Sequence, residues 1–165
     1  MSKKLLISIV CAILFMQGAV FAKAPKFDGR KIDSYQKECN MGAAQGCFFV
    51  GVAYFLGDGL AKNDAKAMEF FKKANKLDKN NAVYIATIAR MYYHAHKING
   101  GAALDDAVRL FDTACRLKDT QSCYELGEIY NYEIFDSSKA VSYYKQSCNL
   151  EKADGCLKLY NLKNK

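Results

Sequence analysis

The chain has 165 residues, 51% of them hydrophobic, and a formal charge of +7 from 24 Lys and Arg against 17 Asp and Glu. This length suits one domain. The positive charge favours acidic partners in general. No run of basic residues is interleaved with aromatic ones, as nucleic-acid binding would require, so nucleic acid is not an expected partner.

The first 22 residues read as a secretory signal peptide. Lys3 and Lys4 precede an apolar stretch over residues 5–16, and a small-residue cleavage site ends at Ala22. The stretch is short for a bilayer span, which needs about 20 residues. We therefore expect cleavage after Ala22 and no stable membrane span in the mature chain, with an uncleaved anchor as the alternative.

Seven cysteines are present, and Cys11 leaves with the signal peptide. Cys11 lacks the small preceding residue of a lipoprotein signal, although lipid attachment there stays open as an alternative. Six cysteines remain: Cys39, Cys47, Cys115, Cys123, Cys148 and Cys156. An even number behind a signal peptide indicates disulfides and an oxidising compartment, the periplasm or the cell exterior.

Residues 23–31 are predicted to be a linker, which contains the only proline, Pro25. From residue 32 onward apolar residues recur three and four positions apart, as in amphipathic helices and unlike strands. The sequence predicts an all-α repeat domain over residues 32–165, with about four antiparallel helix hairpins at residues 32–63, 64–101, 102–135 and 136–165.

The repeat is defined by its first cysteine position, which is occupied by Cys39, Asn75, Cys115 and Cys148 at intervals of 36, 40 and 33 residues. A period in this range indicates a helical solenoid, in which neighbouring repeats bury a core that no single repeat could bury.

The second helix of the repeat carries a small residue where another helix comes close, followed by a tyrosine. The positions are Gly51 with Tyr54 and Gly127 with Tyr130, and equal counting assigns Thr87 and Arg90 to them in the second repeat.

The cysteines of each pair lie eight positions apart. In one straight helix that spacing is about 12 Å, whereas a disulfide needs Cα atoms closer than about 7 Å. Either the thiols stay free or the chain turns between them. Equal counting places Asn75 and Val83 at both cysteine positions of the second repeat, and this joint absence favours pairing within repeats, unless it is chance. The predicted bonds are Cys39–Cys47, Cys115–Cys123 and Cys148–Cys156.

The pattern A-x-x-Y-Y-K-x-[A/S]-C, seven residues, then C-x-x-[L/V]-G-x-x-Y resembles the Sel-1-like repeat, a relative of the tetratricopeptide repeat. The cysteine spacing resembles the secreted Helicobacter cysteine-rich proteins. The resemblance runs from Ile32 to Tyr160 and is weakest in the second repeat. It implies a right-handed superhelix of helix pairs and a role in protein–protein contacts. Some members of this family are described as penicillin-binding proteins or β-lactamases.

A β-lactam hydrolase is therefore the alternative function. Two Ser-x-x-Lys matches exist, Ser34 with Lys37 and Ser142 with Lys145, but no Ser-Asp-Asn or Lys-Thr-Gly follows either. Both matches fall on expected helix surfaces. We assign no catalytic residue.

The two histidines, His94 and His96, would point to different sides of a helix, so no metal site is expected. Neither Cys-x-x-Cys nor a phosphate-binding glycine loop is present, and we expect no cofactor. The best candidate for partner binding is Met91, Tyr92, Tyr93 and His94, in the repeat without cysteines. The predicted function is a monomeric protein–protein interaction scaffold that binds a protein or a cell-envelope component.

Overall fold

A computed structural model describes residues 27–101 and 103–164. The predicted signal peptide, residues 1–22, lies outside the described residues. A short 3-10 helix, η1 (Gly29–Lys31), is followed by α2 (Ile32–Asn40), α3 (Ala44–Leu56), α4 (Asp64–Leu77), α5 (Ala82–Asn99), α6 (Ala103–Arg116), α7 (Thr120–Tyr132), α8 (Ser137–Asn149) and α9 (Ala153–Lys163).

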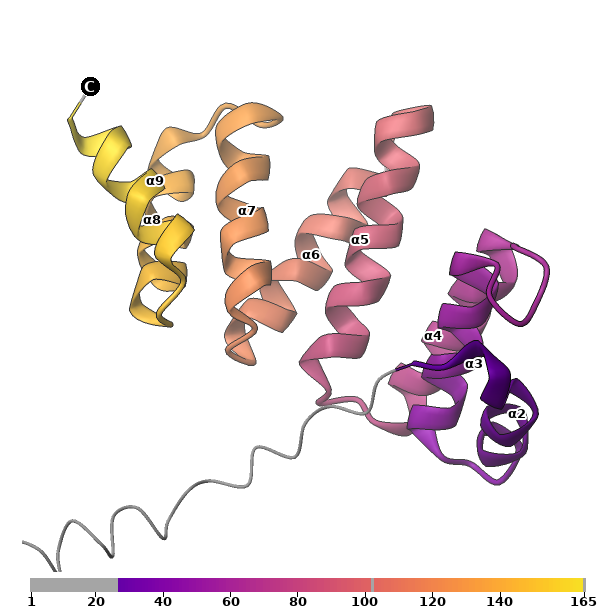
Figure 1. The fold of residues 1–165 in the computed structure, drawn as a ribbon. Helices are drawn as coiled ribbons and strands as arrows, with labels where there is room; N and C mark the ends of the chain where they lie inside the picture. Colours follow the sequence, from indigo (N-terminus) through magenta and orange to yellow (C-terminus); the bar gives the residue numbers. More distant parts are fainter. Residues whose placement is uncertain (1–26, 102, 165) are drawn as a thin grey trace, which may run out of the picture.

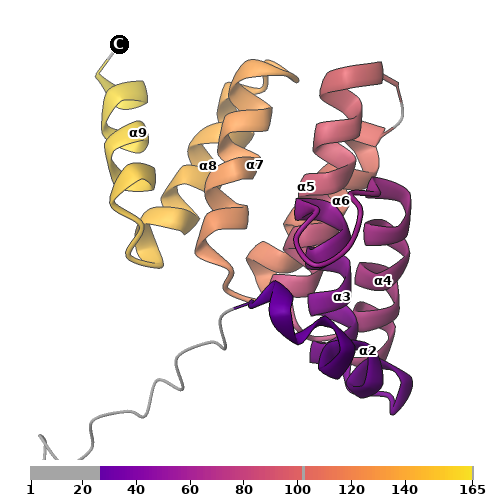
Figure 2. The same ribbon diagram turned by 45° about the vertical axis from the view of Figure 1, so that its right-hand side comes forward.

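The helices stand side by side in chain order, from α2 at one end of the array to α9 at the other (Figures 1 and 2). Each helix packs against the next along the chain, and the pairs α2/α3, α4/α5, α6/α7 and α8/α9 form antiparallel hairpins. No strand occurs in the described part of the chain. The predicted all-α solenoid of helix hairpins is confirmed.

Polar side chains at the helix starts explain where the chain leaves its turns. Asn63, Asn81, Asp119 and Asp136 precede α4, α5, α7 and α8, and each side chain accepts a hydrogen bond from a backbone N–H of the first turn. Each cap satisfies a donor that would otherwise lack a partner, and contributes about 1 kcal/mol.

Three hairpins are closed by disulfides at their turns, which completes the predicted fold class of a solenoid with intra-repeat disulfides. The Cα–Cα distances are 4.4 Å for Cys39–Cys47, 4.8 Å for Cys115–Cys123 and 4.5 Å for Cys148–Cys156. The chain turns between the two cysteines of each pair, as a disulfide at this spacing requires.

Consecutive hairpins meet where a ring from one fits against a glycine of the other. A Cβ atom on Gly51 would lie 2.7 Å from ring carbons of Phe71, and one on Gly127 would lie 2.5 Å from ring carbons of Tyr144. At Gly51 and Gly127 the facing ring leaves no room for a methyl group, because protein interiors are tightly packed.

The described part of the predicted linker, residues 27–31, packs on the first hairpin. The Phe27 ring centroid lies 6.0 Å from that of Tyr35 and 6.1 Å from that of Phe49, and Gly29 is buried. Among the described helices, none combines the length and the apolar character that a bilayer span requires.

Candidate functional site

The second hairpin, α4 and α5, is built differently from the other three. In the others, the backbone N–H of the second cysteine donates to the carbonyl of the residue that precedes the helix, as Cys123 does to Asp119. In α5 the equivalent bond runs from Ile85 to Asn81. Ile85 is buried like Cys123, whereas Val83 is 53% exposed. Ile85, not Val83, therefore takes the second cysteine position.

This two-residue shift corrects the sequence alignment of the second repeat. Counting four and seven positions from Ile85 gives Ala89 and Tyr92, the small residue and the tyrosine of the repeat. Ala89 is fully buried in one cluster with Phe111. Thr87 and Arg90, which equal counting assigned to these positions, lie elsewhere on α5. The error arose because no cysteine marks the longer turn of this hairpin.

A tyrosine near the turn explains why α4 and α5 pack less closely than the helices of the other hairpins. The residue before the second cysteine position is Gly46, Ser122 or Gly155 in the other repeats and Tyr84 here. A Cβ atom on Gly46 would already lie 2.7 Å from the backbone N of Cys39 on the facing helix. The Tyr84 ring packs instead against Phe48, with centroids 4.9 Å apart. Accordingly, α4 and α5 contact each other less than the helices of the other hairpins.

Beside this hairpin lies an apolar groove between α3 and α5, with α4 as its floor. One hollow of about 240 Å³ is lined by Phe55, Phe71, Thr87, Arg90, Met91 and His94. An adjoining hollow of about 280 Å³ shares Phe55, Met91 and His94 and extends past Met68 to Ile98. We call these two hollows together the α3–α5 groove. Phe71 is fully buried beneath it, while Phe55 and Ile98 are 39% and 67% exposed.

Of the four residues predicted to bind a partner, two line the groove and two do not. Met91 and His94 line it. Tyr92 and Tyr93 leave α5 on another side and pack against the buried core. The Tyr93 hydroxyl donates to Glu133 over 3.1 Å, and burial, with this hydrogen bond, raises the pKa of Tyr93. Only half of the predicted set is therefore placed to meet a ligand in this groove.

Sequence reasoning missed Phe55, Met68 and Ile98, which come from three different helices. Their signal in the sequence is weak, because each is an apolar residue near the edge of an amphipathic stripe. Only the packing of α3, α4 and α5 brings them together.

Two partly exposed ion pairs connect α5 to α7 and to the residue that follows α7. Arg90 Nε lies 3.0 Å from Glu125 Oε1, and Lys97 Nζ lies 2.7 Å from Glu133 Oε1. The hydrogen bond from Lys97 lowers the pKa of the Glu133 carboxyl, and the same bond raises the pKa of Lys97. The α5 wall thus has charged contacts with the next hairpin.

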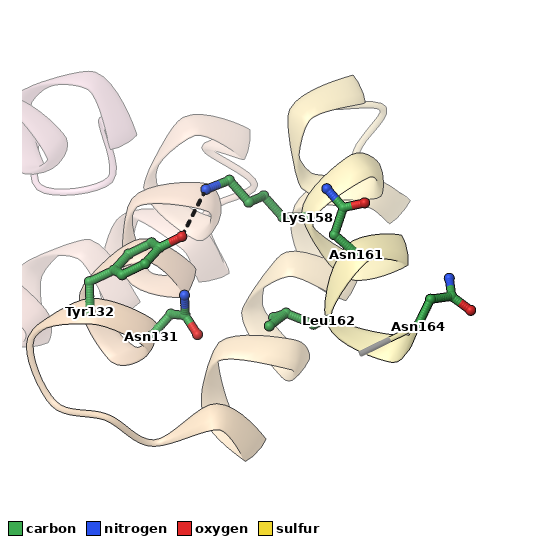
Figure 3. Close-up of a pocket in the computed structure, with 6 residues that line it drawn as sticks. All are labelled: Asn131, Tyr132, Lys158, Asn161, Leu162 and Asn164. Carbon is green, nitrogen blue, oxygen red and sulfur yellow. Dashed lines mark hydrogen bonds between the residues drawn. The ribbon is translucent and has the colours of Figure 1, made fainter.

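An equivalent hollow occurs between the second helices of the last two repeats, α7 and α9 (Figure 3). Its volume is about 420 Å³. Asn131 takes the repeat position of Phe55, and Lys158 takes that of Thr87. Lys158 donates to the Tyr132 hydroxyl over 3.4 Å and pairs with Glu128 over 2.9 Å. The repeat position shared by Phe55 and Asn131 is thus apolar in the α3–α5 groove and polar in the hollow between α7 and α9.

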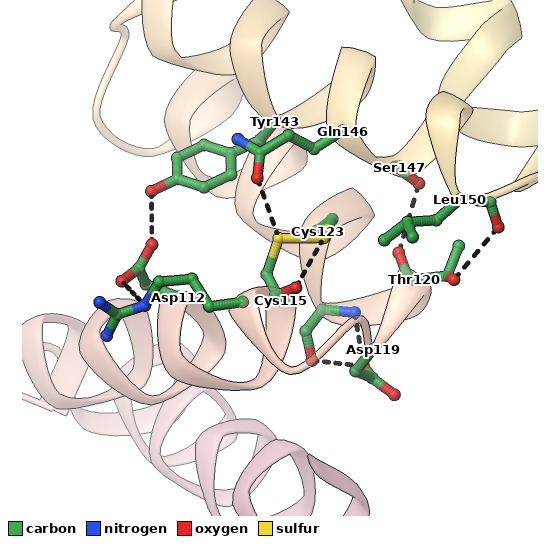
Figure 4. Close-up of a disulfide and its surroundings, with 11 residues drawn as sticks. Asp112, Cys115, Asp119, Thr120, Cys123, Tyr143, Gln146, Ser147 and Leu150 are labelled. Atoms are coloured by element: carbon green, nitrogen blue, oxygen red, sulfur yellow. Dashed lines mark hydrogen bonds and ion pairs between the residues drawn. A yellow bond between two sulfur atoms is a disulfide. The ribbon is translucent and has the colours of Figure 1, made fainter.

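The disulfide at the turn of the third hairpin is buried. Cys115 is 4% exposed and Cys123 is fully buried. Around this bond, the Ser147 hydroxyl of α8 donates to the Thr120 carbonyl over 3.3 Å, and the Thr120 hydroxyl donates to the Leu150 carbonyl over 3.3 Å (Figure 4). These two hydrogen bonds therefore connect the turn of the third hairpin to the fourth hairpin.

The two Ser-x-x-Lys matches are surface features. The Ser34 hydroxyl donates to Glu38 over 3.1 Å. Within the described residues, no hydrogen bond joins Ser34 to Lys37 or Ser142 to Lys145, and all four are exposed. Neither serine is therefore paired with the lysine of its motif, and the carboxylate that accepts from Ser34 lies one turn along the same helix.

The described ranges hold no group of three or more His, Cys, Asp or Glu side chains placed to bind a metal ion. His94 faces the α3–α5 groove, and His96 Nδ1 lies 3.3 Å from the Gly101 carbonyl oxygen.

Two segments of the chain, residues 44–79 and 120–152, match the family model described as the Sel1 repeat. The matches cover α3 with α4 and α7 with α8, the helix pairs joined by the contacts at Gly51 and Gly127. They leave α2, α5, α6 and α9 outside the matched segments. A comparison with curated proteins found no match.

Solved structures share the fold at low sequence identity. A Sel1 repeat protein from Oxalobacter formigenes is 20% identical, with a TM-score of 0.67, over 79% of this chain and 53% of that one. A protective antigen of uropathogenic Escherichia coli is 15% identical, with a TM-score of 0.68, over 81% of this chain and 28% of that one. Cysteine-rich protein B of Helicobacter pylori is 22% identical, with a TM-score of 0.53, over 77% of this chain and 90% of that one.

The chain spans about half of the Oxalobacter protein and about a quarter of the Escherichia coli antigen. Fold and groove together define a disulfide-bonded solenoid of helix hairpins, a scaffold suited to protein–protein interaction. Two segments of the chain match the Sel1 repeat model, and the fold is that of Sel1 repeat proteins.

Proposed function

We propose that this protein is an exported interaction scaffold, acting in the periplasm or outside the cell, that binds a protein partner in the α3–α5 groove. The observation that carries the proposal is the groove itself, where Phe55, Met91 and Ile98 border a hollow over the buried Phe71. Surfaces of this kind are typical of interaction sites on soluble proteins.

The chemistry of the groove favours an apolar anchor from the partner. Phe55 supplies a rigid aromatic wall, and Met68 and Met91 supply flexible thioether side chains that adapt to different shapes. Arg90 and His94 stand among the lining residues and can orient polar groups around such an anchor. A partner that inserts an aromatic or aliphatic side chain would bury it in a desolvated pocket, where binding energy concentrates.

Export is supported by the cysteines. Disulfides such as the three within these hairpins form and persist in oxidising compartments, whereas the cytosol keeps thiols reduced. The predicted signal peptide over residues 1–22 agrees with this assignment.

A capture experiment with matched variants tests the groove. The oxidised mature protein is immobilised and exposed to a cell-envelope extract, and captured proteins are quantified by mass spectrometry. Ile98→Glu places a charge in the groove, and Leu157→Glu places one at a similarly exposed apolar residue of α9. We expect Ile98→Glu to reduce capture of the main partner at least tenfold and Leu157→Glu to leave it unchanged. Equal capture by both variants would contradict the proposal.

The hydrolase alternative is tested with a chromogenic cephalosporin. Because Ser34 and Ser142 are exposed and neither is hydrogen-bonded to the lysine of its motif, we expect no turnover and no covalent adduct by mass. Turnover that disappears in Ser34→Ala or Ser142→Ala would show an enzyme instead.

A further inference from the structure

A second groove, of different chemistry, lies between α4 and α6. A hollow of about 370 Å³ is lined by residues that include Lys72, Asn75, Lys76, Lys79, Arg109 and Leu110, with the buried Ile85 beneath. We call it the α4–α6 groove. It opens at the altered second hairpin, since Asn75 and Ile85 occupy the two positions that hold a disulfide in the other repeats.

The lysines of this groove belong to the second repeat and are not a general feature of the fold. Lys72 and Lys76 lie one helical turn apart on α4. The residues at the same two positions are Gln36 and Asn40 in the first repeat, Asp112 and Arg116 in the third, and Lys145 and Asn149 in the fourth. Only the second repeat has a cation at both positions, and the longer turn after α4 adds Lys79.

The positive charge of the groove is largely uncompensated within the protein. Arg109 pairs with Asp106 over 2.8 Å, and the Lys72 ammonium lies 5.4 Å from the Tyr92 ring centroid. Lys76 and Lys79 have no ion pair within the described ranges. On α5 and α9, by contrast, Lys97 and Lys158 each contact a glutamate.

The side-chain amide of Asn75 is a second, independent observation, because one of its atoms lacks a hydrogen-bond partner in this groove. It stands where the other repeats have a half-cystine, and its buried Oδ1 has no hydrogen-bond partner among the described residues. A buried acceptor left without a donor destabilises the folded state. A side-chain amide both donates and accepts, so a small rotation would let Asn75 pair with the backbone of an extended peptide.

We infer that the α4–α6 groove binds a short acidic peptide segment, whose carboxylates pair with Lys72, Lys76 and Lys79. Apolar side chains of that segment would rest on Leu110 and Ile85. The cations are gathered around one hollow and do not form the extended basic stripe that a nucleic-acid backbone requires. The hollow is separate from the α3–α5 groove, so its test is independent of the function proposed above.

The probe is a fluorescein-labelled decapeptide of alternating glutamate and alanine, with an alternating glutamine and alanine peptide of the same length for comparison. Binding to the oxidised mature protein is measured by fluorescence anisotropy at 0.15 M salt. We expect the glutamate peptide to bind at least tenfold more tightly than the glutamine peptide. The absence of this preference would overturn the inference.

Two variants of α4 with the same change in net charge locate the site. Lys72→Glu with Lys76→Glu reverses charge in the groove, and Lys66→Glu with Lys73→Glu reverses it on exposed residues of the same helix outside the groove lining. We expect at least tenfold weaker binding from the first pair and less than a twofold change from the second. Equal losses would show a general charge effect and refute the site.

Far-UV circular dichroism checks the fold of both variants, and Lys72→Gln with Lys76→Gln provides a milder version of the groove change that should also weaken binding. A 20-base-pair DNA duplex and phosphatidylglycerol vesicles serve as competing anions. Tighter binding of either one through Lys72 and Lys76 would refute the assignment to an acidic peptide.

Discussion

The corrected alignment of the second repeat makes opposite predictions for Thr87 and Ala89, the two neighbours of Ile88 on α5. We replace Ala89 with leucine in one variant and Thr87 with leucine in another. If Ala89 is the close-approach position, Ala89→Leu must disturb the junction with α6, and Thr87→Leu must be tolerated. If Thr87 held that position, as equal counting from the cysteines suggests, the order of the two effects would be reversed.

The size of the effect follows from the equivalent glycines. A single Cβ on Gly51 or Gly127 would lie 2.7 or 2.5 Å from the ring carbons packed against it. Ala89 is fully buried against Ala107 and Phe111, so three further carbons have no space there. Overpacking of this kind costs about 1–3 kcal/mol, and we expect about 3 kcal/mol here. Thr87 is half-buried and lines the α3–α5 groove, where a leucine can occupy the hollow at a cost below about 1 kcal/mol.

Urea unfolding followed by far-UV circular dichroism measures both changes in the free energy of unfolding. A loss of about 3 kcal/mol corresponds to a decrease of about 10 °C in Tm for a domain of this size. The reasoning would be refuted if Thr87→Leu destabilised the protein as much as, or more than, Ala89→Leu.

Three further predictions follow from the disulfides, the ion pairs and the signal peptide. Intact mass of the purified mature protein will be lower by six hydrogens than that of the reduced chain, and a thiol reagent will not react before reduction; a reactive thiol would contradict the three bonds. Glu133→Gln will lower the free energy of unfolding at pH 7, because Lys97 lowers the pKa of Glu133. This stabilisation is present above the ordinary pKa of the carboxyl and is lost as the pH falls through its lowered pKa. In acid titrations of stability, the wild-type and Glu133→Gln proteins will therefore converge below about pH 4. The exported form will begin after residue 22 by N-terminal sequencing, and an intact N-terminus would contradict cleavage.

Much of the fold was predictable because the cysteines mark the repeat. Residues with regular spacing, such as Cys115 and Cys123, fixed the turns of three hairpins, and the glycines at 51 and 127 marked the junctions between them. The second repeat has no such mark. Counting eight residues from Asn75 reached Val83 and missed the longer turn, so Ala89 and Tyr92 were not recognised as the repeated pair.

The candidate site was predictable only in part, because it depends on contacts between helices. The absence of cysteines drew attention to the second repeat, and Met91 and His94 line the α3–α5 groove. The sequence could not separate them from Tyr92 and Tyr93, since the direction of each side chain depends on how α5 packs against α7. Phe55 joins the groove from the first repeat, and no pattern within the second repeat could indicate it.

The central claim, that a partner occupies the α3–α5 groove, is tested most directly by photo-crosslinking in the producing cells. Benzoylphenylalanine is introduced at Ile98, beside the groove, or at Leu157, on the exposed surface of α9. We predict one dominant adduct of constant size from position 98 and no adduct from position 157. The adduct from position 98 should disappear when wild-type protein is present in excess, because the wild-type protein competes for the partner. Adducts of equal strength at both positions, or adducts at position 157 alone, would contradict the account.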